Sequence, residues 1–229
     1  MTSSSEQAPA SARTRTRRAK EKPSETFVVL VRHGKTPTTG QVLPGRAEGL
    51  HLSDEGHTEA AAAADRLFDA YPTPTAIFAS PLERAQETAA PYGERTGLPI
   101  QPAEGLLECD FGEWTGGSLK DLSKTPEWKT VQGAPSRFRF PGGESFTEMS
   151  SRIVHFLEEV EVAHRGGVVV CFSHADPIKA AIADALGLHL DQFQRINVTT
   201  ASISVLAYHD GRPTVVSTNT TPLLPRKAH

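Results

Sequence analysis

The sequence has few cysteines and no long apolar run, and each absence excludes a class of protein. Its 229 residues include only two Cys, too few for the disulfide framework of small secreted domains. No segment has the roughly 18 consecutive apolar residues of a membrane-spanning helix. The N-terminus also lacks the apolar stretch of a signal peptide. We therefore expect a soluble, cytoplasmic, globular protein with no membrane partner.

The chain also has little excess of one sign of charge over the other. The chain has 24 Lys and Arg against 27 Asp and Glu, a net charge of −3. Because the net charge is slightly negative, we do not expect the protein to bind nucleic acid. Residues 1–25 differ, because six basic side chains face three Glu there and no aromatic or branched aliphatic residue precedes Phe27. Such a stretch cannot bury enough surface to fold alone. We expect a disordered basic tail; a transit peptide or a polyanion-binding arm is the alternative.

Patterns for metal ligands are missing as well. The nine His form no H-E-x-x-H, and the two Cys form no C-x-x-C pair. We therefore expect no metal and no cofactor.

Short apolar runs alternate with longer segments whose apolar residues recur at helical spacing. This alternation predicts an α/β fold, a three-layer sandwich with a mainly parallel central sheet and helices on both faces. The expected strands are 27–31, 75–79, 168–172, 201–208 and 213–219, and the expected helices are 53–70, one from 81 that frays or kinks near Pro91, 144–164 and 176–187.

The same pattern predicts the domain organisation. Residues 26–220 form one domain in this interpretation, and 221–229 form a flexible C-terminus. Residues 109–143 are rich in Gly, Pro, Trp and Phe and show no clear periodicity. We interpret them as an insertion near the active site.

Polar side chains follow three of the predicted strands at the point where each strand ends. Arg32 and His33 follow the first strand, Arg84 opens the helix after the second, and His174 follows the strand at 168–172. Because the carboxyl ends of parallel strands meet at one edge of a sheet, we expect these side chains to lie together. Two Arg and two His beside a helix N-terminus would suit a phosphate group.

The segments that carry these residues resemble the histidine phosphatase superfamily, also called the phosphoglycerate-mutase-like fold. The resemblance rests on four motifs in family order over residues 27–208, and ECDFGEWTG looks more like the phosphatase branch. The motifs are RHGKT (32–36), SPLERAQET (80–88), LLECDFGEWTG (106–116) and FSHADPIK (172–179).

The resemblance implies a role for each matching residue. It makes His33 the nucleophile that accepts the phosphoryl group, and it makes Arg32, Arg84 and His174 the ligands of the phosphoryl oxygens. Glu108 becomes the general acid and base. A neutral His can attack phosphorus, and the two Arg can stabilise the charge of the transferred group without a metal.

Two departures from the family pattern concern the loop after the first strand. Lys35 stands where an acidic residue is common, and we expect it to add positive charge near the phosphate. Thr39 stands where many members carry Asn, so a hydroxyl replaces an amide as the phosphate contact. Thr36 and the Gly45-Arg46 pair are either further substrate contacts or loop structure.

The other candidate residues leave two interpretations open. Trp114, Trp128, Phe138 and Phe140 either line the mouth of the site or pack in the core. Cys109 and Cys171 flank the expected site, but a free Cys is commonly a small buried hydrophobe.

The expected function is a metal-independent phosphomonoesterase that acts on a small phosphorylated metabolite. A phosphoglycerate mutase or other phosphomutase is the alternative within the family. A catalytically inactive binding or scaffold protein is the alternative outside it, although all five expected catalytic residues are present. The sequence identifies neither the substrate nor the oligomeric state; a homodimer is the commonest assembly.

Overall fold

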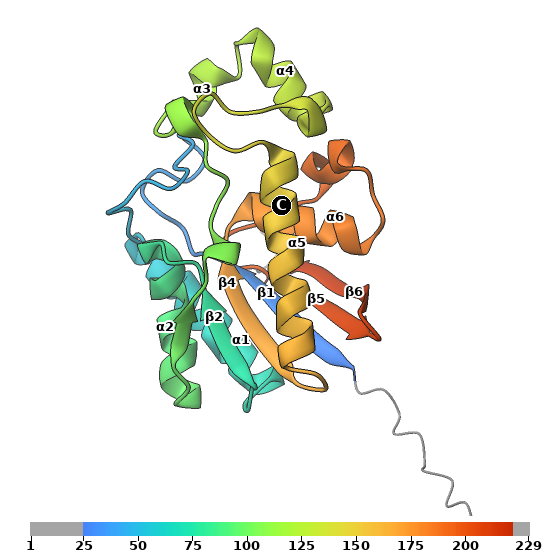
Figure 1. The fold of residues 1–229 in the computed structure, drawn as a ribbon. Helices are drawn as coiled ribbons and strands as arrows, with labels where there is room; N and C mark the ends of the chain where they lie inside the picture. Colours follow the sequence, from blue (N-terminus) through green and yellow to red (C-terminus); the bar gives the residue numbers. More distant parts are fainter. Residues whose placement is uncertain (1–24, 222–229) are drawn as a thin grey trace, which may run out of the picture.

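The computed structural model describes residues 25–221, and Figure 1 shows their fold. The tail and C-terminus expected at 1–25 and 221–229 lie outside this range, except for Glu25 and Thr221. The strands are β1 (Thr26–Arg32), β2 (Ala76–Ala79), β3 (Ile100–Pro102), β4 (Val168–Ser173), β5 (Ile203–His209) and β6 (Arg212–Thr220). The α-helices are α1 (Asp54–Ala70), α2 (Glu83–Thr96), α3 (Leu119–Leu122), α4 (Pro126–Gly133), α5 (Phe146–Ala163) and α6 (Ala175–Ala185). The 3₁₀ helices are η1 (Glu104–Leu106), η2 (Gly112–Trp114), η3 (Pro135–Arg137) and η4 (Leu190–Arg195).

The strands form one sheet in the order β3-β2-β4-β1-β5-β6. The four strands β3, β2, β4 and β1 run parallel, and the pairs β1–β5 and β5–β6 are antiparallel. In the central register, Val29 of β1 lies between Val170 of β4 and Val205 of β5. The mainly parallel sheet is therefore confirmed.

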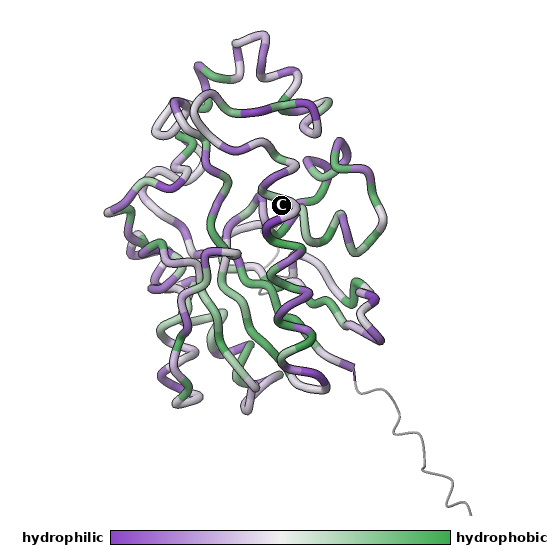
Figure 2. The backbone as a smooth tube through the Cα atoms, in the orientation of Figure 1, coloured by the Kyte–Doolittle hydropathy of each residue, from purple (hydrophilic) through white to green (hydrophobic). Residues whose placement is uncertain are grey.

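Helices cover both faces of this sheet, which confirms the three-layer sandwich (Figure 1). Alternate residues of β1 point to opposite sides: Leu30 belongs to the core cluster that contains Ile153 of α5, and Val29 to the cluster that contains Leu67 of α1. Helix α6 joins the first cluster and α2 joins the second. Hydrophobic residues accordingly concentrate along the strands in Figure 2, as expected for strands buried on both faces.

Local sequence signals account for several element boundaries. Ser53 caps α1 by accepting a hydrogen bond from the Gly56 amide, and Ser145 forms a capping box with Glu148 at the start of α5. The β5–β6 hairpin turns at Asp210 and Gly211, whose φ angles of 50° and 75° suit a tight hairpin turn. These predicted elements are confirmed with shifts of one to a few residues.

The predicted fraying near Pro91 is wrong, because α2 continues to Thr96. Pro91 removes one helix hydrogen bond, but the next residues are fixed by tertiary contacts. Tyr92 is fully buried, and its hydroxyl donates to the Tyr71 carbonyl at 2.6 Å. The helix ends instead at Gly97, in the left-handed region.

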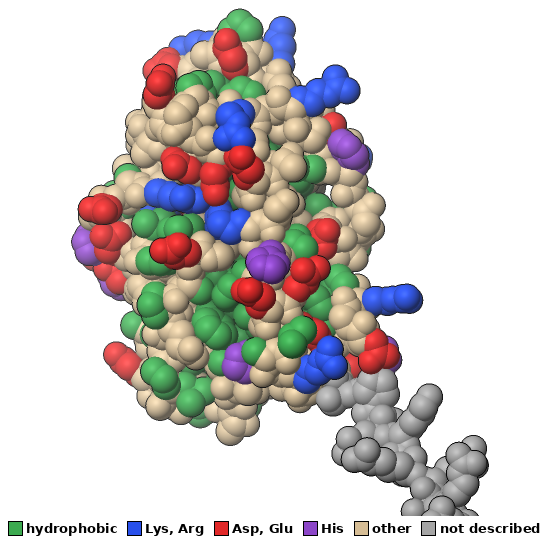
Figure 3. Space-filling view, viewed as in Figure 1, with side chains coloured by type: hydrophobic (Ala, Val, Ile, Leu, Met, Phe, Trp, Pro, Cys, Tyr) green, Lys and Arg blue, Asp and Glu red, His purple; other side chains and the backbone are tan. Residues whose placement is uncertain are grey.

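The segment 109–143 contains short helices that its sequence did not predict. Helices α3 and α4 lie at the top of the molecule in Figure 1, beyond the ends of the parallel strands. Over residues 25–221, the helices fall short of the length and apolarity that crossing a membrane requires. Acidic and basic side chains are interspersed on the face seen in Figure 3, in keeping with the small net charge.

Candidate active site

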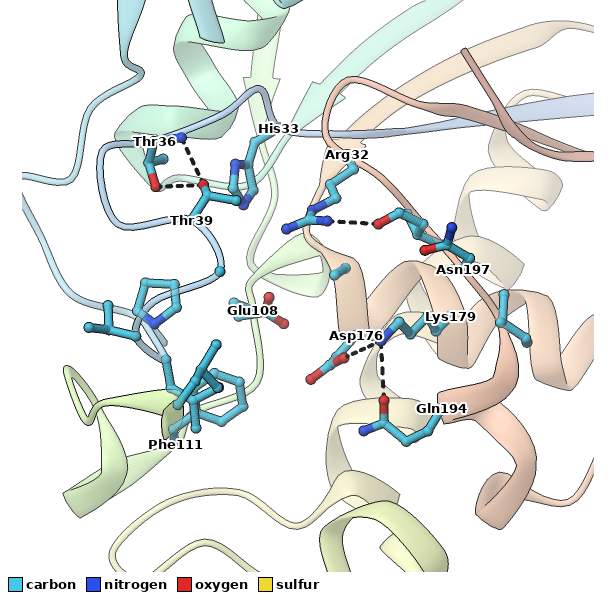
Figure 4. Close-up of a pocket in the computed structure, with 18 of the residues that line it drawn as sticks. Arg32, His33, Thr36, Thr39, Glu108, Phe111, Asp176, Lys179, Gln194 and Asn197 are labelled. Atoms are coloured by element: carbon cyan, nitrogen blue, oxygen red, sulfur yellow. Dashed lines mark hydrogen bonds and ion pairs between the residues drawn. The ribbon is translucent and has the colours of Figure 1, made fainter. Parts of the chain in front are cut away.

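The structure brings the predicted strand-end residues together at one edge of the sheet. The rings of His33 and His174 lie 5.2 Å apart, centroid to centroid. Arg32, His33 and Glu108 line a cavity of about 390 Å³, and Arg84 and His174 are completely buried. Figure 4 shows the lining residues pointing into this shared space.

His33 is held by the backbone of two strands and by its own loop. Its amide donates to the Ser173 carbonyl of β4 at 2.9 Å, which continues the parallel ladder. Its ring Nδ1 lies 2.7 Å from the Gly34 carbonyl oxygen. A carbonyl only accepts, so Nδ1 carries the proton and Nε2 keeps a lone pair. Burial, and next the charges of Arg32 and Arg84, lower the pKa of His33 well below its usual value, which keeps the ring neutral.

Gly34 lets the His33 loop approach α1 closely. A Cβ at this position would lie 2.6 Å from the Gly56 carbonyl oxygen, a distance that a side chain cannot tolerate. The Gly34 amide also donates to Thr88 Oγ1 at 2.9 Å, and that hydroxyl donates to the Arg84 carbonyl at 2.6 Å. The loop that carries His33 is thereby tied to the helix that carries Arg84.

Four buried side-chain nitrogens around His33 have no hydrogen-bond partner among residues 25–221: Arg32 Nε, Arg84 Nε, Arg84 Nη1 and His174 Nδ1. The ring nitrogen of His174 is a donor in the tautomer in which its Nε2 accepts from the Ser80 hydroxyl, which itself accepts from the Leu82 amide. The remaining donors anchor the side chains, because Arg32 Nη1 donates to the Val198 carbonyl and Arg84 Nη2 to the Gly45 carbonyl, both at 2.7 Å. Burial of an unsatisfied donor is costly. A cluster of four such donors around a His suits a tetrahedral oxyanion.

Glu108 is buried in the same cavity, with 6% of its surface exposed. Its Oε1 accepts a hydrogen bond from the Cys109 amide at 2.9 Å. Burial, and next the negative charge of Asp176, raise the pKa of Glu108 to about 7, against the opposing effects of that amide, Arg84 and Arg32. A carboxyl with this pKa can both donate and accept a proton near neutral pH.

Two arginines and a glutamate fix the backbone at Glu108. Arg46 Nε and Arg152 Nη2 both donate to the Glu108 carbonyl, at 3.0 and 3.3 Å. Arg152 Nη1 also donates to the carbonyls of three nearby residues, Glu104, Gly105 and Leu107. Glu144 pairs with Arg46 at 2.8 Å and with Arg152 at 3.0 Å. We call Arg46, Glu144 and Arg152 the Glu108 support.

The cavity extends away from His33 between one apolar and one polar wall. The apolar wall consists of Val42, Leu43, Pro44, Phe111 and Leu119. The polar wall consists of Asp176, Lys179, Gln194, Arg195 and Asn197, which come from α6, η4 and the segment after η4. Phe111 and Leu119 belong to the segment 109–143, so this segment contributes to the cavity.

One expectation about the loop after β1 is wrong, and one open alternative is decided. Lys35 pairs with Glu55 on the surface at 2.6 Å, because α1 presents that carboxylate in its exposed first turn. It therefore does not direct its charge into the cavity. Gly45 accepts from Arg84 and Arg46 donates to the Glu108 carbonyl, which favours the loop-structure alternative for this pair.

Thr36 and Thr39 do line the cavity, and their hydroxyl oxygens lie 2.9 Å apart (Figure 4). Thr39 Oγ1 also accepts from the Thr36 amide at 2.9 Å. The two threonines therefore stabilise the loop and also face the cavity, where a substrate could contact them.

The structure divides the aromatic and cysteine candidates between core and cavity. Trp128 and Phe140 line a second cavity of about 170 Å³ next to the main one. Phe138 belongs to the core cluster, and Trp114 stacks on Trp128 and packs against that cluster. Burial raises the pKa of both Cys109 and Cys171, so neither supplies a thiolate.

Sequence reasoning missed the residues whose role depends on contacts between distant segments. Ser80 lies within a recognised motif, but only the structure shows its hydroxyl 2.8 Å from His174 Nε2. Asp176 lies in the motif FSHADPIK, and its place near the arginines signals a site role. Gln194 and Asn197 lie in a segment that carries no recognisable signal.

Comparison with known proteins identifies the family. The sequence model of the histidine phosphatase superfamily (branch 1) matches residues 28–221. Phosphoserine phosphatase 1 of Hydrogenobacter thermophilus is 31% identical over 199 residues, which cover 85% of this chain and 92% of that protein. Glucosyl-3-phosphoglycerate phosphatase of Mycolicibacterium vanbaalenii is also 31% identical over 199 residues, covering 81% and 87% of the two chains.

A solved structure agrees with these sequence matches. The native structure of a mycobacterial glucosyl-3-phosphoglycerate phosphatase superimposes with a TM-score of 0.77 and 28% identity, covering 86% of this chain and 100% of the other. The resemblance carried by the four motifs is thus confirmed. The chain belongs to branch 1 of the histidine phosphatase superfamily.

Proposed function

We propose that this phosphatase hydrolyses phosphate monoesters of small metabolites through a phosphohistidine on His33. The observation that carries the proposal is the arrangement of a neutral His33, with a protonated Nδ1, among the unpartnered donors of Arg32, Arg84 and His174. Relatives named phosphoserine phosphatase and glucosyl-3-phosphoglycerate phosphatase support a small phosphorylated metabolite as substrate.

In the first step, His33 Nε2 attacks phosphorus and the bond between phosphorus and the ester oxygen breaks. Glu108 donates its proton to the departing oxygen, so the product leaves as a neutral alcohol. Arg32, Arg84 and His174 bind the phosphoryl oxygens, whose negative charge is spread over three atoms in the transition state. The pKa of Glu108 near 7 provides the protonated form that this step needs.

In the second step, the Glu108 carboxylate left by the first step removes a proton from water. The water oxygen attacks phosphorus, the bond from phosphorus to Nε2 breaks, and inorganic phosphate is released. His33 returns to its neutral form and Glu108 to its protonated form. The positive charge in both steps comes from Arg32 and Arg84, so the reaction needs no divalent cation.

A rapid-quench experiment tests the mechanism. Brief reaction with a ³²P-labelled ester, in the presence of EDTA, should trap an acid-labile, base-stable phosphoenzyme in the wild-type protein. His33→Ala should form no phosphoenzyme and release no phosphate, and His57→Ala, which changes an exposed histidine of α1, should behave as wild type. Turnover by His33→Ala at the wild-type rate would refute the proposal.

The same assay separates hydrolysis from phosphomutase activity. Water and a second hydroxyl compete for the phosphohistidine, so phosphate release is measured beside conversion of 3-phosphoglycerate to 2-phosphoglycerate. We expect phosphate release to dominate. We also propose a cytoplasmic location and a homodimer, which cell fractionation and light scattering test directly.

A further inference from the structure

We propose that Lys179 and Gln194 bind a carboxylate on the leaving group, so that the substrates are phosphate esters of small hydroxy or amino acids. This inference rests on the proposed function, since it concerns the part of the substrate that departs from the phosphoryl group. It adds an acid-binding subsite at the polar wall of the cavity.

The subsite lies where two cavities meet. Lys179 is on α6, one turn after Asp176, and Gln194 is on η4. All three residues line both the main cavity and the smaller one lined by Trp128 and Phe140. They therefore face the space that remains for a leaving group once the phosphate lies at His33 (Figure 4).

The hydrogen bonds of Lys179 leave its ammonium partly unused. Its Nζ lies 3.3 Å from Asp176 Oδ1 and 3.2 Å from Gln194 Oε1, both longer than the usual 2.7–2.9 Å, roughly, of charge-assisted hydrogen bonds. An ammonium has three donors, and these two acceptors are its partners in the described range. The side chain is only 17% exposed, so solvent has little access to the remaining proton.

The neighbouring amide complements this cation. Gln194 Oε1 accepts from Lys179, so its Nε2 is left as a donor beside the ammonium. Two adjacent donors, one of them charged, match the two oxygens of a carboxylate. A carboxylate can accept from both donors at once, whereas a hydroxyl of a neutral polyol offers a single acceptor atom.

Asp176 gives the subsite an acceptor next to its donors. One carboxylate oxygen contacts Lys179, and the carboxylate points into the cavity towards Glu108 (Figure 4). A hydroxyl or ammonium on the carbon beside the substrate carboxylate would donate to it. Both an α-hydroxy and an α-amino acid supply that donor.

A panel of four esters tests the carboxylate and its neighbouring donor separately. O-phospho-L-serine and 3-phospho-D-glycerate have a carboxylate, whereas phosphoethanolamine and glycerol 3-phosphate offer the same donors without one. We expect kcat/KM for the two acids to exceed that of the matched carboxylate-free ester by about 10- to 100-fold, the range of a charged hydrogen bond. Lys179→Gln should bring this ratio close to one, Lys179→Arg should restore part of it, and Lys120→Gln, at an exposed lysine of α3, should leave it unchanged.

The donor beside the carboxylate is identified by Asp176→Asn. If an ammonium contacts Asp176, the variant loses more activity on phosphoserine than on phosphoglycerate; if a hydroxyl does, the order is reversed. Either order supports the subsite.

Equal kcat/KM for the four esters in the wild-type protein would overturn the subsite. An unchanged ratio between acids and carboxylate-free esters in Lys179→Gln would do the same. In either case, turnover of p-nitrophenyl phosphate would leave the proposed function intact. Failure to hydrolyse p-nitrophenyl phosphate as well would overturn both.

Discussion

The two ends of the cavity are built in different ways. One end, which we propose binds the phosphate and call the phosphate end, holds Arg32 at the end of β1, His33 and His174 directly after β1 and β4, and Arg84 in the first turn of α2. At the other end, proposed for the leaving group and called the leaving-group end, Leu119 comes from the segment 109–143 and Gln194 from a 3₁₀ helix outside the sheet. The sheet therefore positions the proposed catalytic residues, while segments beyond its edge form the walls of the rest of the cavity.

The polar groups at the two ends also differ in how far they are satisfied. Arg84 leaves two buried nitrogens without a partner in the described chain, whereas Asp176 and Lys179 pair with each other. Unpaired donors give most to a transition state that carries negative charge. Paired groups give selectivity instead, because a wrong ligand breaks their pairing without replacing it.

Glu108 lies between the two ends of the cavity. Its substitution should give the largest loss of activity, and the size of the loss should depend on the leaving group. Glu108→Gln keeps the shape of the side chain but has no proton to transfer, so alkyl phosphates should react ~10²–10⁴-fold more slowly. p-Nitrophenyl phosphate needs little protonation, so its first phosphoryl transfer should slow less and phosphoenzyme should accumulate. Rapid-quench measurement of the first turnover checks this. Equal slowing for good and poor leaving groups would assign the acid to another residue.

Arg84 tests the phosphate end by itself. Arg84→Ala should lower kcat/KM by about 10²–10³-fold for every ester, good or poor leaving group alike, because one charge-stabilising contact is lost. Arg84→Lys should recover only part of this, since a point charge cannot replace the planar fork. Arg95→Lys at the exposed end of α2 provides the control. A lysine variant with wild-type activity would place Arg84 outside the phosphate site.

Arg152 tests whether Glu108 depends on the support behind it. Its four backbone carbonyl partners hold the carboxyl in its buried position, so Arg152→Lys should lower kcat/KM by about tenfold, roughly one charged hydrogen bond. The pH profile separates this from a general loss of structure.

In the wild-type protein, Glu108 must be protonated for the first step, so activity should fall as the pH rises through about 7, the pKa of this group. Looser packing in Arg152→Lys would admit water and reduce the effect of burial on the pKa. The fall should therefore begin at a lower pH. Arg139→Lys, an exposed arginine paired with Glu148, is the matched control, and an identical pH profile in Arg152→Lys would refute the positioning role.

Leu119 tests the apolar wall and should show the smallest effect. Leu119→Ala removes apolar contact area, which corresponds to about 3- to 10-fold in KM for the preferred ester. The amount of phosphoenzyme formed at saturating p-nitrophenyl phosphate should stay at the wild-type level. A large fall in that amount would mean that the insertion helps to shape the phosphate end, and Leu186→Ala, at an exposed leucine, controls for apolar truncation.

The same division explains what could be predicted from the sequence. The phosphate end follows from strand ends, which hydrophobic runs reveal, so Arg32, His33 and His174 were placed together without coordinates. Lys35 was misjudged, because its partner Glu55 lies 20 residues away and no local pattern shows the pair. Gln194 was missed for the same physical reason, since its place in the cavity is fixed by contact between η4 and α6.

The unpartnered donors at the phosphate end have a consequence for the end of the reaction cycle. Arg32 Nε, Arg84 Nη1 and His174 Nδ1 are as well placed for free orthophosphate as for the phosphoryl group in transit. We therefore expect product inhibition from the same geometry that we propose for catalysis. We expect turnover to slow as the concentration of free phosphate rises, whichever alcohol the substrate releases.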